Sequence, residues 1–94
     1  MFTIQHESGG TVKLVCRLDT NQAPQAIQAL DGMSGAVTID LSGLDYISSA
    51  GLGVFIVTHN RLKAAGGSLE LVNPTNHIRH IFHLARLEQV LTIK

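Results

Sequence analysis

The segment spanning residues 36–67 constrains the fold more than any other part of the chain. Residues 36–41 (AVTIDL) form a β-rich run that is ended by Ser-Gly, which predicts a central strand with both faces partly covered. Residues 54–65 contain no helix breaker and are stopped by two glycines, which predicts a long helix. A loop rich in Ser and Gly, residues 48–53, joins the two elements. We therefore expect a unit of strand, loop and helix at the centre of the fold.

The N-terminal segment is predicted to form a two-stranded hairpin. Residues 2–6 alternate weakly between apolar and polar side chains, and residues 8–10 (SGG) have turn chemistry. Residues 11–18 alternate more clearly, which predicts the second strand. One face of that strand carries Val12, Leu14 and Cys16.

Two shorter helices are predicted, one before the central strand and one near the C-terminus. The first has N-cap candidates at residues 19–21 (DTN), tolerates Pro24 in its first turn and is stopped by a glycine. The other follows a strand over residues 68–72 and a turn with capping residues at 73–76 (NPTN). Its apolar positions are Ile78, Ile81, Phe82 and Ala85. A last short strand could cover residues 90–93.

This alternation of strands and helices predicts an α/β domain over residues 1–94. Elements of this length pack in layers, and we expect about three helices on a central mixed sheet of about four to five strands. A chain of 94 residues fits one domain, and its hydrophobic content of 45% is ample for a single core.

The composition argues against several classes of partner. Seven Lys and Arg balance seven Asp and Glu, so the chain lacks the long-range positive field that draws proteins to nucleic acid or to anionic membranes. Its longest apolar-rich segment, residues 51–58, is far shorter than the roughly 18 to 20 residues that a membrane span needs. The single cysteine, Cys16, cannot form an internal disulfide, and the N-terminus does not have the pattern of a signal peptide. We therefore expect a cytoplasmic protein that binds neither nucleic acid nor membrane.

The segment most informative about function is DLSGLDYISSAGLG, residues 40–53, which joins the central strand to the long helix. A serine at a helix entrance lies near unpaired backbone N–H groups and the positive end of the helix dipole, and small neighbours let another molecule approach closely. A kinase could reach such a hydroxyl, and a phosphate would add about −1.5 to −2 charge. The spacing alone leaves two uses open for Ser48 and Ser49, a helix cap or a modified residue.

Two further features are compatible with a binding surface. On the long helix, one apolar stripe is expected to face the sheet, formed by Leu52, Phe55, Ile56 and Leu62. Val54 and Val57 are then left over near the Ser loop, where they form a docking patch or belong to a helix that is buried more widely. Asp19 ends a predicted strand and could share one edge of the domain with Ser49, or could simply cap the next helix.

Enzymatic chemistry finds little support in the sequence. Three histidines are spaced three residues apart on a predicted helix: His77, His80 and His83. They spread over an arc of that helix, and no Cys or acidic cluster completes a metal site. The loop around Ser49 lacks the GxSxG pattern of serine hydrolases, and Gly51 and Gly53 belong to neither a GxGxxG fingerprint nor a P-loop. We therefore expect no catalysis, no metal and no cofactor.

The segment DLSGLDYISSAGLG resembles the signature of the anti-sigma factor antagonists and of the wider STAS domain family. The resemblance extends over nearly the whole chain, through RLDT at residues 17–20, AAGGSLELVNP at residues 64–74 and FHLARL at residues 82–87. In that family the phosphorylated Ser or Thr lies two residues before the first glycine of the GLG run, which corresponds to Ser49. An aspartate at the end of the second strand, near the surface that faces the partner and a nucleotide, corresponds to Asp19.

The resemblance implies a single STAS-type domain that works as a partner switch and catalyses nothing. The unphosphorylated form would bind an anti-sigma factor that is also a serine kinase of the GHKL type. Phosphorylation of Ser49 would break this complex, and a serine phosphatase of the PP2C type would reset it. The residues expected at the partner surface are Asp19, Thr20, Ser48, Ser49, Ala50, Gly51, Leu52, Gly53, Val54 and Val57. Weak nucleotide binding near Asp19 and Ser49 stays open, as does the oligomeric state.

Members of the family also serve as regulatory subunits of transporters or as scaffolds of signalling assemblies, and a fold resemblance does not choose among these uses. The chain departs from the family pattern in three places. Cys16 stands where a glycine often precedes the RLD-like segment, and Ser48 replaces an acidic residue. The chain also ends soon after its last predicted strand, where many members add another helix. We therefore expect the sheet or the third helix to be less covered than usual.

Overall fold

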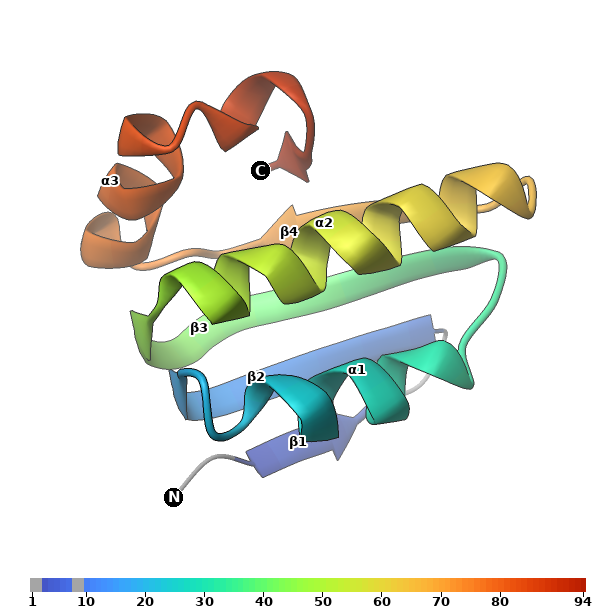
Figure 1. Cartoon of the computed structure of the whole chain (residues 1–94), viewed down its shortest axis with the longest axis horizontal. Helices are drawn as coiled ribbons and strands as arrows, with labels where there is room; N and C mark the ends of the chain where they lie inside the picture. The colour runs from blue at the N-terminus through green and yellow to red at the C-terminus, as the bar shows by residue number, and fades with distance from the viewer. Residues whose placement is uncertain (1–2, 8–9) are drawn as a thin grey trace.

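The computed structural model describes residues 3–7 and 10–94, and its centre is a sheet of five strands (Figure 1). The strands are β1 (Thr3–His6), β2 (Thr11–Leu18), β3 (Ala36–Ile47), β4 (Ser68–Val72) and β5 (Thr92–Ile93). Their order across the sheet follows their order in the chain. β1 pairs with β2 in an antiparallel hairpin, and the later neighbours pair in parallel. The predicted mixed sheet is therefore confirmed.

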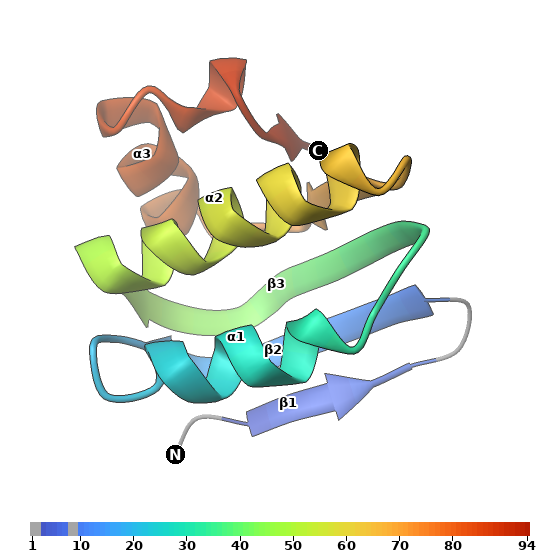
Figure 2. The same ribbon diagram turned by 45° about the vertical axis from the view of Figure 1, so that its right-hand side comes forward.

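Within the described residues, helices connect the successive parallel strands. They are α1 (Ala23–Asp31), α2 (Ser49–Ala64), α3 (Asn76–Leu84) and the short 3₁₀ helix η2 (Leu87–Gln89). α1 and α2 lie side by side over the same face of the sheet in both views (Figures 1 and 2). The α/β class with three helices on the sheet agrees with the prediction. In the same part of the chain, none of these helices has the length and apolar character that a membrane crossing requires.

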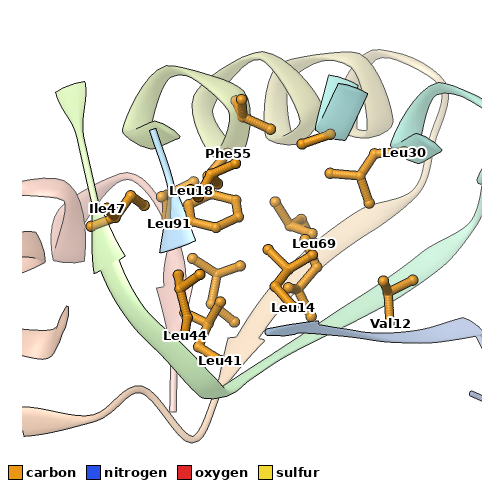
Figure 3. Packing of buried hydrophobic residues seen from close by; sticks show 14 of the residues in the cluster. Val12, Leu14, Leu18, Leu30, Leu41, Leu44, Ile47, Phe55, Leu69 and Leu91 are labelled. Carbon is orange, nitrogen blue, oxygen red and sulfur yellow. The ribbon is translucent and has the colours of Figure 1, made fainter. Parts of the chain in front are cut away.

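The core lies between the sheet and the helices. On β3, every second side chain between residues 37 and 41 is buried, whereas the alternate ones are only half-buried. Figure 3 shows Leu14 of β2 and Leu69 of β4 in the same cluster. The rings of Phe55 on α2 and Phe82 on α3 pack with their centroids 6.0 Å apart. Each fully buried Leu or Phe stabilises the fold by about 1.5 to 3 kcal/mol, so this cluster holds α2 on the sheet.

β3 is longer than the sequence predicted. We expected the strand to end at Ser42 and Gly43, but it continues to Ile47. Gly43 pairs with Val15 of β2 just after a shift in register, and a Cβ atom at Gly43 would lie only 3.2 Å from the Leu14 carbonyl oxygen. A glycine inside a strand often marks such an irregularity, so this one permits a close approach of β2 and does not end the strand.

β2 loses its predicted alternation at Cys16. Val12 and Leu14 are fully buried, as expected. Cys16, predicted on the same face, is only half-buried, and Leu18 takes the next core position. The pairing with β3 shifts between Cys16 and Arg17, and Cys16 has a left-handed φ of 80°. The period of two therefore fails at Cys16 alone, where the backbone is irregular, and Leu18 returns to the face of Val12 and Leu14.

The first helix begins differently from the prediction. We expected an N-cap within residues 19–21, but Gln22 is the N-cap and its side chain makes no capping hydrogen bond. Pro24 lies in the first turn, as predicted. The Asp19 carboxylate instead accepts a hydrogen bond from the backbone N–H of Asn21 at 3.0 Å. Such a local turn competes with helix capping, which explains why the expected cap does not form.

At the two ends of the chain the structure agrees with the predicted elements only in part. Phe2 and residues 8–9 of the predicted hairpin lie outside the described residues. Near the C-terminus, Thr75 caps α3 as expected, and its hydroxyl accepts a hydrogen bond from the helix backbone at 3.3 Å. The strand predicted over residues 90–93 is confined to Thr92–Ile93, because η2 and a turn occupy the preceding positions.

Candidate functional site

The candidate site lies where the carboxyl ends of β2 and β3 meet the start of α2 (Figure 1). The backbone N–H of Ser48 donates to the carbonyl oxygen of Leu18, the last residue of β2, at 2.9 Å. Because Ser48 directly follows β3, this bond ties both strands to the helix entrance. Asp19 directly follows Leu18, so the structure brings Asp19 and the two serines to one edge of the sheet, which is one of the two alternatives that the sequence left open for Asp19.

Ser48 is the N-cap of α2. Its hydroxyl accepts a hydrogen bond from the backbone N–H of Gly51 at 3.3 Å, and its carbonyl accepts from the N–H of Leu52 at 2.9 Å. Its backbone is extended, with φ −96° and ψ 176°, as an N-cap requires. The choice that the spacing left open between the two serines is therefore resolved in favour of Ser48 as the cap.

Ser49 is the first residue of α2 and is exposed to solvent. Among the hydrogen bonds described for residues 3–7 and 10–94, none uses its hydroxyl. The first turn of α2 carries no acidic side chain, so nothing within the helix neutralises the positive end of its dipole. Ser49 thus offers a free hydroxyl at a position that suits an anion.

The two glycines after Ser49 meet opposite surroundings. Gly51 is buried, and a Cβ atom there would lie 2.6 Å from the Leu18 carbonyl oxygen and 2.7 Å from the Ile47 side chain. Gly53 has no such neighbour, since a Cβ atom there would meet no atom within 4 Å. Gly51 is therefore required for the close packing of α2 on β2, whereas Gly53 leaves open space above the helix.

The apolar side chains of α2 that are buried differ from those of the predicted stripe. Phe55 is fully buried, as expected, but Leu52 and Ile56 are only half-buried. Val54 is 1% exposed and belongs to the core, so its predicted place in a docking patch is wrong. The reason is that α2 packs against α1 as well as the sheet, which buries more than one stripe. Val57 is 50% exposed and remains available at the surface.

A chain of interacting side chains leads away from Asp19. Arg17 Nε lies 3.1 Å from an Asp19 carboxylate oxygen, and the Arg17 guanidinium lies 4.9 Å from the centroid of the Tyr46 ring. Arg17 and Tyr46 are paired across β2 and β3. Sequence reasoning missed this contact because only the strand register, with its shift, brings the two residues opposite each other. Of the other predicted site residues, Thr20 is exposed and Ala50 is half-buried.

The carboxyl group of Asp40, at the start of the signature segment, has a lowered pKa. Partial burial by itself raises this pKa, but hydrogen bonds from Ser42 and Asn73 and the charge of Lys13 outweigh that effect and bring it below 3.8. The backbone N–H of Ser42 donates to the carboxylate at 2.9 Å. Asp45, the second acidic residue of the segment, is exposed on β3. Asp40 is therefore ionised at neutral pH.

A model of the family described as "Mlab, STAS domain" matches residues 2–92. The chain belongs to the STAS domain family. The anti-sigma-B factor antagonist of Bacillus subtilis is 29% identical to this STAS domain over 92 residues, which make up 95% of this chain and 84% of that relative.

Solved structures share the fold of this STAS domain. An anti-sigma factor antagonist from Mycobacterium paratuberculosis matches it with a TM-score of 0.81 at 23% identity, over 99% of this chain and 83% of that one. Bacillus SpoIIAA in its unphosphorylated form matches with a TM-score of 0.72 at 19% identity, over 100% and 87% of the two chains. The phosphorylated form of SpoIIAA matches with a TM-score of 0.70 at 20% identity, over 100% and 91%. At these identities the likeness establishes the fold alone.

Proposed function

We propose that this STAS domain is an anti-sigma factor antagonist whose binding to an anti-sigma factor is controlled by phosphorylation of Ser49. The relative from Bacillus subtilis bears the name anti-sigma-B factor antagonist and aligns over most of both chains. The phosphorylation step is supported by the different roles of the two serines, because Ser48 caps α2 whereas Ser49 is exposed. A cap must keep its hydrogen bond, whereas an exposed hydroxyl can be modified without losing a native contact.

In the unphosphorylated form, the partner contacts the outward side of the α2 entrance. Because Gly53 has no side chain, the surface of the partner can come close to the helix backbone. Val57 lies one turn further on, is 50% exposed and adds apolar contact area. This approach buries the Ser49 hydroxyl while it is neutral, at a much smaller desolvation cost than a charge would carry. Asp19 and Thr20 extend the contact along the sheet edge.

Phosphorylation of Ser49 replaces the hydroxyl by a group with about −1.5 to −2 charge. The unpaired N–H groups and the dipole of the first turn of α2 can stabilise that charge, so the fold stays intact. The match of this fold to both forms of SpoIIAA supports this part of the proposal. The partner, however, would have to desolvate a dianion to keep its contact, and the complex is expected to dissociate.

The scheme requires two further activities. An anti-sigma factor with serine kinase activity, of the GHKL type, would phosphorylate Ser49, and a serine phosphatase of the PP2C type would remove the phosphate. All three proteins would meet in the cytoplasm, where ATP is available to the kinase. The STAS domain is the substrate and the regulator in this cycle, and it catalyses neither step.

The phosphorylated residue can be located with the wild-type protein and two matched variants, Ser49→Ala and Ser48→Ala. Each is incubated with ATP and an extract of the source cells, recovered, and analysed by intact and fragment mass spectrometry. We expect one phosphate on Ser49 in the wild type and in Ser48→Ala, and none in Ser49→Ala. Phosphate found on Ser48 alone would contradict the assignment of Ser49 as the phosphorylated residue.

Partner release can be tested with Ser49→Asp. Its affinity for the anti-sigma factor, measured by calorimetry, is expected to be weaker than that of the wild type by about 1 to 3 kcal/mol, the scale of an unpaired charge in an interface. Asn60→Asp is the matched control, because Asn60 is exposed on α2 about three turns further along. An equal loss of affinity in both variants would show a general charge effect and remove the release mechanism.

A further inference from the structure

The C-terminal segment has a positive net charge, although the net charge of the whole chain is zero. Residues 75–94 contain three basic and one acidic side chain, a net charge of +2 with neutral histidines. Residues 1–74 contain four basic and six acidic side chains, a net charge of −2. Three of the five histidines also lie in the C-terminal segment: His77, His80 and His83. The surface of α3 and η2 is therefore the cationic part of the protein.

A surface cavity lies between α3 and η2 in this segment. It has a volume of about 300 Å³ and is lined by Asn76, Arg79, His80, His83 and Glu88. A second hollow of about 320 Å³ adjoins it through His83 and Glu88 and adds Arg86. Arg86 has a left-handed φ of 58° where the chain leaves α3 for η2. We call the first cavity the α3 pocket.

The side chains around the α3 pocket differ in whether their charge is already paired. His83 Nδ1 lies 2.7 Å from Glu88 Oε1, and the third basic residue of the segment, Lys94, lies 2.7 Å from a carboxylate oxygen of Glu70. Among the ion pairs of the described residues, none involves Arg79 or Arg86. The two arginines are thus the cations that an incoming ligand can engage without breaking an existing ion pair.

We infer that the α3 pocket binds the phosphate group of a small molecule. Arg79 offers a planar fork of N–H donors that matches phosphate geometry, and Asn76 and His80 add further N–H donors beside it. The hollow is shallow and open, so its volume of about 300 Å³ can receive a phosphate group but does not enclose a whole ligand. Each lining residue carries a polar group that can meet a phosphate, and the apolar parts of the same side chains can contact the rest of the molecule. Among the described residues, no group of three His, Cys, Asp or Glu side chains is placed to hold a metal ion.

Glu88 limits the affinity of the α3 pocket. Its carboxylate repels a phosphate, and its contact of 2.7 Å occupies the His83 ring nitrogen that could otherwise donate to the ligand. Removing the charge of Glu88 while keeping its shape should therefore tighten binding. This expectation separates a phosphate site from a site for a cationic ligand, which would lose affinity in the same variant.

The experiment is a titration followed by ¹H–¹⁵N NMR at pH 7 and constant ionic strength, with inorganic phosphate in one arm and glucose 6-phosphate in the other. We expect saturable shifts confined to the backbone signals of the α3 pocket in at least one arm, and the arm that saturates at lower concentration identifies a free or an esterified phosphate. Arg79→Gln should weaken binding at least about tenfold, as expected for the loss of a charge-assisted hydrogen bond. Glu88→Gln should tighten it several-fold.

Two controls make the outcome decisive. Lys63→Gln removes the same charge from the end of α2 that lies away from α3 in Figures 1 and 2, and it should bind like the wild type. Ser49→Asp should also bind unchanged, which separates the α3 pocket from the anion-accepting entrance of α2. The proposal is overturned by shifts that grow linearly and match those caused by chloride, by equal losses in Arg79→Gln and Lys63→Gln, or by shifts centred on the start of α2.

Discussion

The two sides of the first turns of α2 come from one short motif but meet different surroundings. On the inner side, Ser48 and Gly51 touch Leu18 of β2, through a hydrogen bond of 2.9 Å and a backbone approach that leaves no room for a Cβ atom. On the outer side, Ser49 is exposed and Gly53 has open space above it. This motif therefore combines positions that hold the helix on the sheet with positions that stay open to solvent.

This difference separates two measurable quantities. Changes on the inner side should alter the free energy of unfolding, because the native contacts there are internal. Changes on the outer side break no native contact, so they should not destabilise the protein, but they should alter the affinity for the partner. Substitutions at Gly51, at the two serines and at Gly53 test the separation, and substitutions at Cys16 and Asp40 test the two neighbouring strands. They follow from the largest expected effect on stability to the smallest.

Gly51→Ala is expected to destabilise the protein most, by about 1 to 3 kcal/mol, because the added methyl group would lie 2.6 Å from a backbone oxygen that cannot move aside easily. The midpoint of urea denaturation followed by circular dichroism measures the change. If Gly51→Ala had the same midpoint as the wild type, α2 could shift outward at no cost in free energy. Close packing at Gly51 would then not be needed for stability.

Ser48→Ala is expected to cost about 1 kcal/mol, because it removes the oxygen that accepts the Gly51 N–H. Ser49→Ala, which changes the neighbouring exposed hydroxyl, should shift the free energy of unfolding by less than about 0.5 kcal/mol. The same urea denaturation compares the pair. If Ser49→Ala were the more destabilising of the two, the assignment of the cap would be wrong.

Gly53→Ala is expected to raise stability by about 0.5 to 1 kcal/mol, since alanine favours the helix and the site has room for the methyl group. The same methyl group should weaken partner binding, because it fills the space through which the partner approaches the helix. Denaturation and calorimetry on one sample measure both effects. A variant that is stabilised and still binds normally would place the interface elsewhere on α2.

Cys16→Gly is expected to stabilise the protein by about 0.5 kcal/mol. The left-handed φ of 80° costs about 1 to 2 kcal/mol for a residue with a Cβ atom, and the greater freedom of glycine in the unfolded chain offsets part of the gain. Cys16→Ala is the control, because it removes the thiol but keeps the strain. A midpoint of thermal unfolding lower for Cys16→Gly than for Cys16→Ala would show that the backbone here is not strained, because only the entropy cost of glycine would then remain. This position is also where the family often carries a glycine, and the positive φ supplies the physical reason.

The smallest effect is expected for Asp40, which lies away from the α2 entrance. Its pKa is lowered in the folded state, so its contribution to stability is present above the unfolded value of 3.8 and is lost as the pH falls through the folded-state pKa. Asp40→Asn should therefore flatten the dependence of unfolding free energy on pH below about pH 4. Parallel pH profiles of the wild type and the variant would contradict the lowered pKa.

Most of the elements were predictable because their signals are local. The hairpin, the long helix before two glycines and the third helix with its Thr75 cap follow from periodicity and turn chemistry over a few residues. The errors arose where a distant segment intervenes. β3 continues past Gly43 because β2 pairs with it there, and Val54 is buried because α1 packs beside α2.

At the candidate site, the sequence by itself determined that a long helix follows the serines and glycines, and the resemblance to a known signature pointed to Ser49. The expected loop over residues 48–53 was wrong, because α2 already begins at Ser49. Only the tertiary structure decided which serine caps the helix and which glycine is structurally required. The physical reason is that both answers depend on Leu18, whose carbonyl oxygen binds the Ser48 N–H and excludes a side chain at Gly51. A contact between residues that far apart in the chain is set by strand register and packing, which no local pattern encodes.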